Sequence, residues 1–107
     1  MKTFFGSIFI ERKKLEEAGI EYPIKLEYYK IINEDEFISG KNAKYGIEII
    51  KTEYLDNDIK VEKKSIKYLS NNEQRVNDIL KILKENEVTP ISVQDIICDY
   101  SKNLLFI

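Results

Sequence analysis

The sequence predicts an α+β domain in which an antiparallel meander of three to four strands is followed by two C-terminal helices packed on one face. Two periodicities lead to this class. Within residues 3–68 apolar residues recur at alternate positions, as in strands, and within residues 71–102 they recur every three to four positions, as in helices. A chain of 107 residues suits one domain with one core, so we treat residues 1–107 as a single domain.

The first half begins with two predicted strands. MKTFFGSIFI, residues 1–10, starts like a secretory leader, but its apolar run is short and meets ERKK without a small-residue cleavage site. We therefore read residues 3–12 as a strand. IKLEYYKII, residues 24–32, is rich in β-branched and aromatic residues at alternate positions, with Lys30 as the one break. Its buried row would consist of Ile24, Leu26, Tyr28 and Ile32.

Two further strands are predicted to form a hairpin. YGIEIIKTEY, residues 45–54, alternates, and IKV, residues 59–61, starts another run. LDND between them is a tight turn of the Asp/Asn kind, and the polar segment 33–44 reads as a looser hairpin loop. The buried row of the longer strand would be Tyr45, Ile47 and Ile49.

The alternation changes phase within the last strand. Ile66 and Tyr68 have the opposite parity to Val61, so they share its face only if the strand absorbs one extra residue. We expect a β-bulge near Lys63 and Lys64 that restores the phase, since a bulge inserts one residue into one strand of a pair.

A first helix is predicted over about residues 71–86. Ser70 and Glu73 have the spacing of a capping box, in which each side chain accepts a backbone N–H that the first turn leaves free. Asn86 suits the left-handed residue that often ends a helix. The apolar stripe would consist of Val76, Ile79, Leu80 and Leu83.

A second helix is predicted over about residues 90–102. Thr89 before Pro90 suits an N-cap, because proline pushes the preceding residue into the extended region. Ser92 with Asp95 is the alternative cap, so the start stays open by about three residues. Val93, Ile96, Ile97 and Tyr100 would form its apolar stripe, and Leu104 extends it.

Two helices joined by a short turn also outline a DNA-binding helix-turn-helix. Phosphate contacts dominate DNA affinity, so a DNA reader needs cations on its second helix. Residues 70–107 carry four basic and six acidic side chains, and Asp95 and Asp99 would face solvent. We therefore favour a corner that covers the sheet and expect no nucleic acid partner.

The residue types of common catalytic and metal sites are missing from the sequence. The chain has no histidine, no glycine-rich phosphate loop and no nucleophile elbow. Cys98 is the one cysteine, which rules out an intramolecular disulfide, fits a reducing cytoplasm, and reads as a small buried hydrophobe. We expect no catalytic residues, no metal and no cofactor, and no membrane association, since no apolar run approaches 18 residues.

YGIEI, the cap at Ser70 and VNDILKILKENEVTPISVQDIICDY together resemble a family of small uncharacterised proteins from low-GC Gram-positive bacteria. Those proteins have a β-rich first half with Tyr-Gly-(Ile/Val)-Glu, and they end in a helix, an N-x-V-x-P turn and a D-(V/I)-I-x-D helix. The resemblance covers roughly residues 24–102. It implies no activity and no site, because the family has no assigned function.

A second row of apolar residues follows the same strands on the face opposite the core row. Apolar surface of this kind is either covered or marks an interface. The N-terminal segment could cover it within the chain, or a second copy or another protein could bind it. The residues are Tyr29, Ile31, Ile50 and Tyr54, and the N-terminal candidates are Phe4, Phe5, Ile8, Phe9 and Ile10.

Four lysines, Lys60, Lys63, Lys64 and Lys67, lie within eight residues along and after the last strand. Such a cluster could attract a nucleotide or an acidic partner. Because Glu62 lies within the run, the favoured interpretation is that these lysines protect an edge strand from aggregation.

We expect a non-enzymatic cytoplasmic protein, a regulator or adaptor, that binds another protein or itself through the outer sheet face or an edge strand. The alternative is a small-molecule binding protein whose tyrosines stack a nucleotide-like anion while the lysines neutralise its phosphates. A helix-turn-helix DNA-binding regulator is the third hypothesis.

Overall fold

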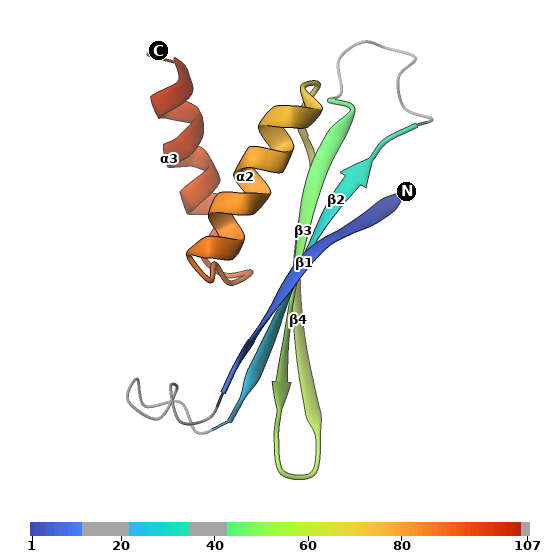
Figure 1. Cartoon of the computed structure of the whole chain (residues 1–107), viewed down its shortest axis with the longest axis vertical. Helices are drawn as coiled ribbons and strands as arrows, with labels where there is room; N and C mark the ends of the chain where they lie inside the picture. Colours follow the sequence, from blue (N-terminus) through green and yellow to red (C-terminus); the bar gives the residue numbers. More distant parts are fainter. Residues whose placement is uncertain (12–21, 35–42, 106–107) are drawn as a thin grey trace.

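The computed structural model describes residues 1–11, 22–34 and 43–105, the last six by their backbone. Four antiparallel strands form a meander in the order β1-β2-β3-β4, followed by two helices, which is the predicted α+β arrangement (Figure 1). The elements are β1 (Lys2–Ile10), β2 (Ile24–Ile32), β3 (Tyr45–Tyr54), β4 (Ile59–Ser70), α2 (Glu73–Glu85) and α3 (Val93–Leu105).

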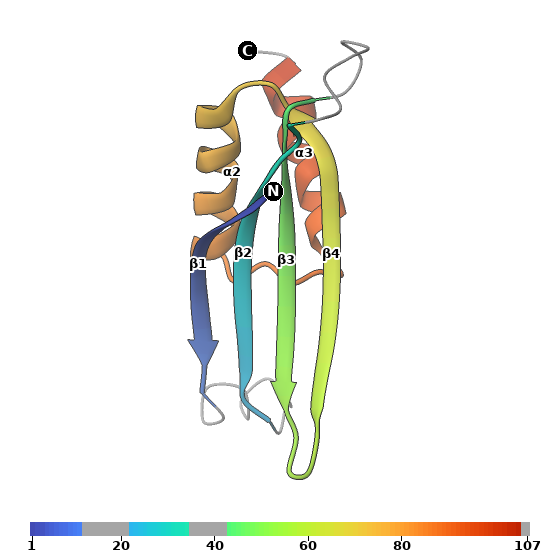
Figure 2. The same ribbon diagram turned by 90° about the vertical axis from the view of Figure 1, so that its right-hand side faces the viewer.

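Both helices lie on the same face of the sheet, as Figures 1 and 2 show together. The α2 stripe and most of the predicted strand rows are buried between the helices and the sheet, because alternate strand positions and one helix stripe point at the same core. Ile32 and Tyr45, at the end of the sheet near the 33–44 connection, are half-buried, so their prediction as buried residues is wrong. The predicted loop over residues 33–44 lies partly outside the described residues. The core consists of Ile10, Ile24, Leu26, Tyr28, Ile47, Ile49, Val76, Ile79, Leu80, Leu83, Val88, Val93 and Ile97.

Lys30, the one polar residue in the buried row of β2, reaches the first turns of α2. Its ammonium lies 3.2 Å from Asn77 Oδ1 and 3.3 Å from a carboxylate oxygen of Glu73. A lysine can bury its aliphatic stem and keep its charged end paired, so the break in the pattern costs the core little.

The predicted bulge near Lys63 and Lys64 is wrong in position. The β3–β4 register is continuous through both lysines and shifts after Ile66, opposite Gly46. A Cβ at Gly46 would lie 2.2 Å from the carbonyl oxygen of Lys67, so only glycine lets the two backbones approach this closely. Consequently Val61 points away from the helices while Ile66 packs against the core.

Helix α2 differs from the prediction at both caps. Its N-cap is Asn72, whose side chain accepts from the Arg75 backbone N–H at 3.1 Å, while Ser70 Oγ accepts from the Asn72 N–H. The prediction of a capping box with Ser70 as the N-cap is therefore wrong, and the true N-cap lies two residues later. At the other end Glu87, with φ of 53°, takes the left-handed position predicted for Asn86.

The α2–α3 connection is tied to the sheet. Tyr28, fully buried on β2, donates its hydroxyl to the Val88 carbonyl at 2.9 Å. The Val88 N–H in turn bonds to the Leu83 carbonyl, as in a Schellman motif. The connection that could belong to a helix-turn-helix is thus part of the sheet-covering layer.

Helix α3 begins at Val93, which places Ser92 at its N-cap position and selects the second of the two predicted starts. Cys98 is exposed, so its prediction as a buried residue is wrong. It follows buried Ile97 by one position, about 100° around the helix, and lines a surface hollow between α3 and β4. The side chains of Tyr100 and of residues 104–107 lie outside those described.

Candidate functional site

The sheet face turned away from the helices, which we call the outer face, is seen directly in Figure 2, with α2 and α3 behind the strands. It carries the most exposed large apolar side chains of the described strands. Phe4, Phe9, Ile59 and Val61 are each 55 to 58% exposed. Large apolar side chains gathered on one face are unusual for a monomer surface and typical of an interface.

The N-terminal strand extends the outer face instead of covering it. β1 is an edge strand paired with β2, and its register places Phe4 beside Tyr29 and Phe9 beside Lys25. Intramolecular cover by this segment, one of the alternatives raised by the sequence, is therefore limited to ring contacts of Phe4 and Phe9 with tyrosines of the neighbouring strands, and both phenylalanines stay exposed. Ile8 and Ile10 point to the opposite side, where they join the core.

The strand register places all four apolar residues predicted for this surface on the outer face. Tyr29 pairs with Glu48, Ile31 with Gly46, and Ile50 with Glu27. Tyr29, Ile31 and Ile50 are half-buried among their neighbours, and Tyr54 is exposed. They thus line the floor of the face, while the residues from the two edge strands project further into solvent.

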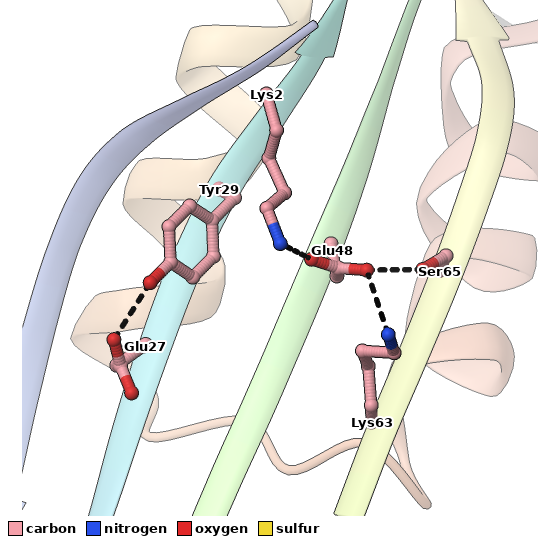
Figure 3. Close-up of polar contacts among 6 residues, drawn as sticks. All are labelled: Lys2, Glu27, Tyr29, Glu48, Lys63 and Ser65. Carbon is pink, nitrogen blue, oxygen red and sulfur yellow. Dashed lines mark hydrogen bonds and ion pairs between the residues drawn. The ribbon is translucent and has the colours of Figure 1, made fainter.

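Glu48 lies at the centre of this face, with its side chain only 8% exposed. Lys2 Nζ is 2.6 Å from Oε2, and Ser65 Oγ donates to Oε1 at 2.7 Å (Figure 3). Lys63 Nζ lies 4.0 Å from the same Oε1. The cluster therefore connects β1, β3 and β4 across the sheet.

Burial acts to raise the pKa of the Glu48 carboxyl, but hydrogen bonds from Lys2 and Ser65 and the charges of Lys2 and Lys63 outweigh burial and hold the pKa below its usual value. The carboxylate is consequently ionised at neutral pH. Its charge is balanced by cations of its own chain, so it needs no external partner.

Tyr29 is held in place by contacts on three sides. Its hydroxyl donates to Glu27 Oε2 at 2.7 Å, a bond that raises the pKa of the phenol (Figure 3). The Phe4 ring meets it edge-on with 5.5 Å between centroids, and Lys2 Nζ lies 4.6 Å from the ring centre. An aromatic group fixed in this way loses little conformational freedom when a partner covers it.

The end of the outer face near the β3–β4 turn forms an apolar patch of Phe9, Tyr54, Ile59 and Val61. The Phe9 and Tyr54 rings lie 6.1 Å apart, and Ile59 pairs directly with Tyr54. Ile59 and Val61 were not predicted to belong to this surface, because their alternation alone does not say which face of the strand they take. Glu48 could have been predicted as a residue of the outer face, because it alternates with Ile47 and Ile49 of the buried row.

The four predicted lysines do not form one patch. All belong to β4, an edge strand, but Lys63 faces Glu48 on the outer face, whereas Lys60 and Lys64 alternate to the helix side. Lys67 lies in the shifted segment opposite Gly46, with its Nζ 5.4 Å from the centre of the Tyr68 ring. Their division between faces weakens a shared role in binding one anion.

Neither of the described helices has the length and apolarity that a membrane span requires. Comparison with the curated proteins and with the solved structures gives no significant match. A family model does match, over residues 7–103. This range includes all of the outer face except the part contributed by residues 2–6 of β1. The chain therefore belongs to the family of unknown function DUF6514.

Proposed function

We propose that the protein is a non-enzymatic regulator or adaptor in the cytoplasm of low-GC Gram-positive bacteria, the group that the sequence resemblance implies. It binds another protein or a second copy of itself through the outer face. The observation that carries the proposal is the exposure of Phe4, Phe9, Ile59 and Val61 on one face of the sheet. Aromatic and aliphatic anchors grouped in this way supply most of the binding energy at protein interfaces.

The polar centre of the face supports the same role. Covering an unpaired charge is costly, because its hydration is lost without compensation. Glu48 already has Lys2, Lys63 and Ser65 as partners within the chain, so a protein that covers the face does not isolate this carboxylate. The centre of the face can thus be buried without a matching charge on the partner.

The test compares proteins retained by three immobilised baits: the wild-type chain, a Phe9→Asp, Val61→Asp variant, and an Ile91→Asp control. Ile91 is 78% exposed in the α2–α3 connection, so its variant changes surface charge away from the outer face. We expect partners that the wild type and the control retain and the face variant loses, with unchanged far-UV circular dichroism. If no retained protein distinguishes the face variant from the control, the outer face is not the binding surface.

The alternative is binding of a nucleotide-like anion. A groove of about 320 Å³ between β4 and the α2–α3 connection is lined in part by Lys63 and Lys64, which favours an anion, but Glu62 also lines it. A ligand that binds only the folded state raises its melting temperature. Stabilisation by one nucleotide of a panel, lost in Lys64→Ala, would support this alternative over the first.

A further inference from the structure

The outer face has the area that an interface with a second copy requires. Four strands about 4.8 Å apart and about nine residues long, at about 3.3 Å per residue, cover about 19 by 30 Å. Each copy would bury about 600 Å², or about 1,200 Å² for the pair, which is the lower limit of the standard size for specific interfaces. Side chains that project from the edge strands, such as Phe9 and Val61, add to this flat area.

The register arranges the charges of the face asymmetrically across the strands. One row runs Ser7, Glu27, Ile50 and Lys63 from β1 to β4. The acidic group of this row therefore lies on β2 and the basic group on the opposite edge strand. The next row towards the β3–β4 turn runs Phe9, Lys25, Thr52 and Val61.

We propose that a second copy of the chain packs on this face, sheet against sheet, around a two-fold axis that runs along the strands; this rests on the proposed function of the face. The axis places β1 of one copy over β4 of the other and β2 over β3. Phe9 then meets Val61 of the second copy, and Glu27 lies over Ile50 near Lys63 of that copy. Packed sheets about 10 Å apart interdigitate such side chains.

An axis across the strands gives the opposite electrostatic result. Such an axis would pass through the row of Ser7, Glu27, Ile50 and Lys63, which lies at the centre of the face. Each residue of this row would then meet the same residue of the second copy. Glu27 would face Glu27, and Lys63 would face Lys63. Like charges placed opposite each other are destabilising, and at interfaces they exclude the arrangement. The charge pattern therefore selects the axis along the strands.

The first test is the solution mass of the full chain by light scattering over a concentration series. We expect the wild type and the Ile91→Asp control at twice the 12.6 kDa of one chain, and Phe9→Asp at the mass of one chain with an unchanged circular dichroism spectrum. A wild type that is monomeric throughout overturns the second copy and leaves the proposed function open to the bait comparison. A Phe9→Asp variant that stays dimeric also overturns it.

The second test fixes the axis by cross-linking thiols in a Cys98→Ser background, with a reagent that spans about 10 Å, the distance between packed sheets. The Phe9→Cys, Val61→Cys double variant should give covalent dimers, and each single variant should not. Within one chain the two positions lie three strand spacings apart, about 14 Å, so the reagent should not join them there. Dimers from Phe9→Cys alone would overturn the proposed axis.

Discussion

Gly46 tests how the register of β4, and with it the outer face, is set. A Cβ added there would lie 2.2 Å from the Lys67 carbonyl oxygen and 2.3 Å from that of Ile66, while real Cβ atoms essentially never approach below 3.0 Å. The contacting atoms are backbone, so Gly46→Ala must displace one strand by about 1 Å. A hydrogen bond stretched by this amount is lost.

The Lys67 carbonyl accepts from Asn33 Nδ2 at 2.8 Å, and Asn33 is buried. Asn33 Nδ2 keeps its bond to the Ala43 carbonyl at 3.2 Å, so loss of the Lys67 bond leaves one of its two N–H groups unsatisfied, which costs about 1–3 kcal/mol. Forcing extra volume into a packed site costs about 1–3 kcal/mol more. We therefore expect Gly46→Ala to lower the free energy of unfolding by about 2–6 kcal/mol, a large part of the about 5–15 kcal/mol typical of a domain.

Gly6→Ala is the matched control. Its Cβ would meet the flexible side chain of Lys84 at 3.1 Å, which can move aside, so we expect a change below about 1 kcal/mol. Both variants lose the same backbone freedom in the unfolded state, so the difference between their stabilities reports the steric clash in the folded state. The assay is urea unfolding followed by far-UV circular dichroism. Equal stabilities of the two variants would refute the close approach at Gly46.

Three further predictions use the same assay. Because the pKa of Glu48 is held below its usual 4.5, its contribution to stability is present above that pH and should be lost as pH falls through the folded pKa; Glu48→Gln should flatten this dependence, and an unchanged slope would contradict it. Tyr28→Phe should cost about 1–3 kcal/mol, because the buried Val88 carbonyl loses its donor, and a neutral result would contradict the bond. Asn72→Ala should cost about 1 kcal/mol through loss of the N-cap, and more than Ser70→Ala; the reverse order would restore the capping box.

Local patterns were sufficient for the order and type of the elements. The segments 24–32 and 45–54 are strands with the predicted bounds, because they are rich in β-branched and aromatic residues at alternate positions. The apolar stripe of α2 is buried as predicted, because residues that recur with the 3.6-residue period of a helix always lie on one of its faces. Corrections at the helix ends are small, because several polar residues near each end can serve as caps.

Tertiary structure decided which face each residue of β4 takes. The alternation of apolar residues within β4 fits either face of the sheet, so it does not fix how the strand pairs with β3. The close backbone approach at Gly46 places the register shift between β3 and β4 after Ile66. Val61 and Ile59 thereby take the outer face, where they form half of the apolar patch.

The sequence by itself determined that the chain forms a meander followed by two covering helices, because hydrophobic period is a local property of the chain. Only the folded chain brings Lys2, Glu48 and Ser65 together from three strands, and only it leaves β1 at the sheet edge with Phe4 and Phe9 exposed. The physical reason is that strand pairing joins residues far apart in sequence, so the composition of a sheet face depends on register and strand order.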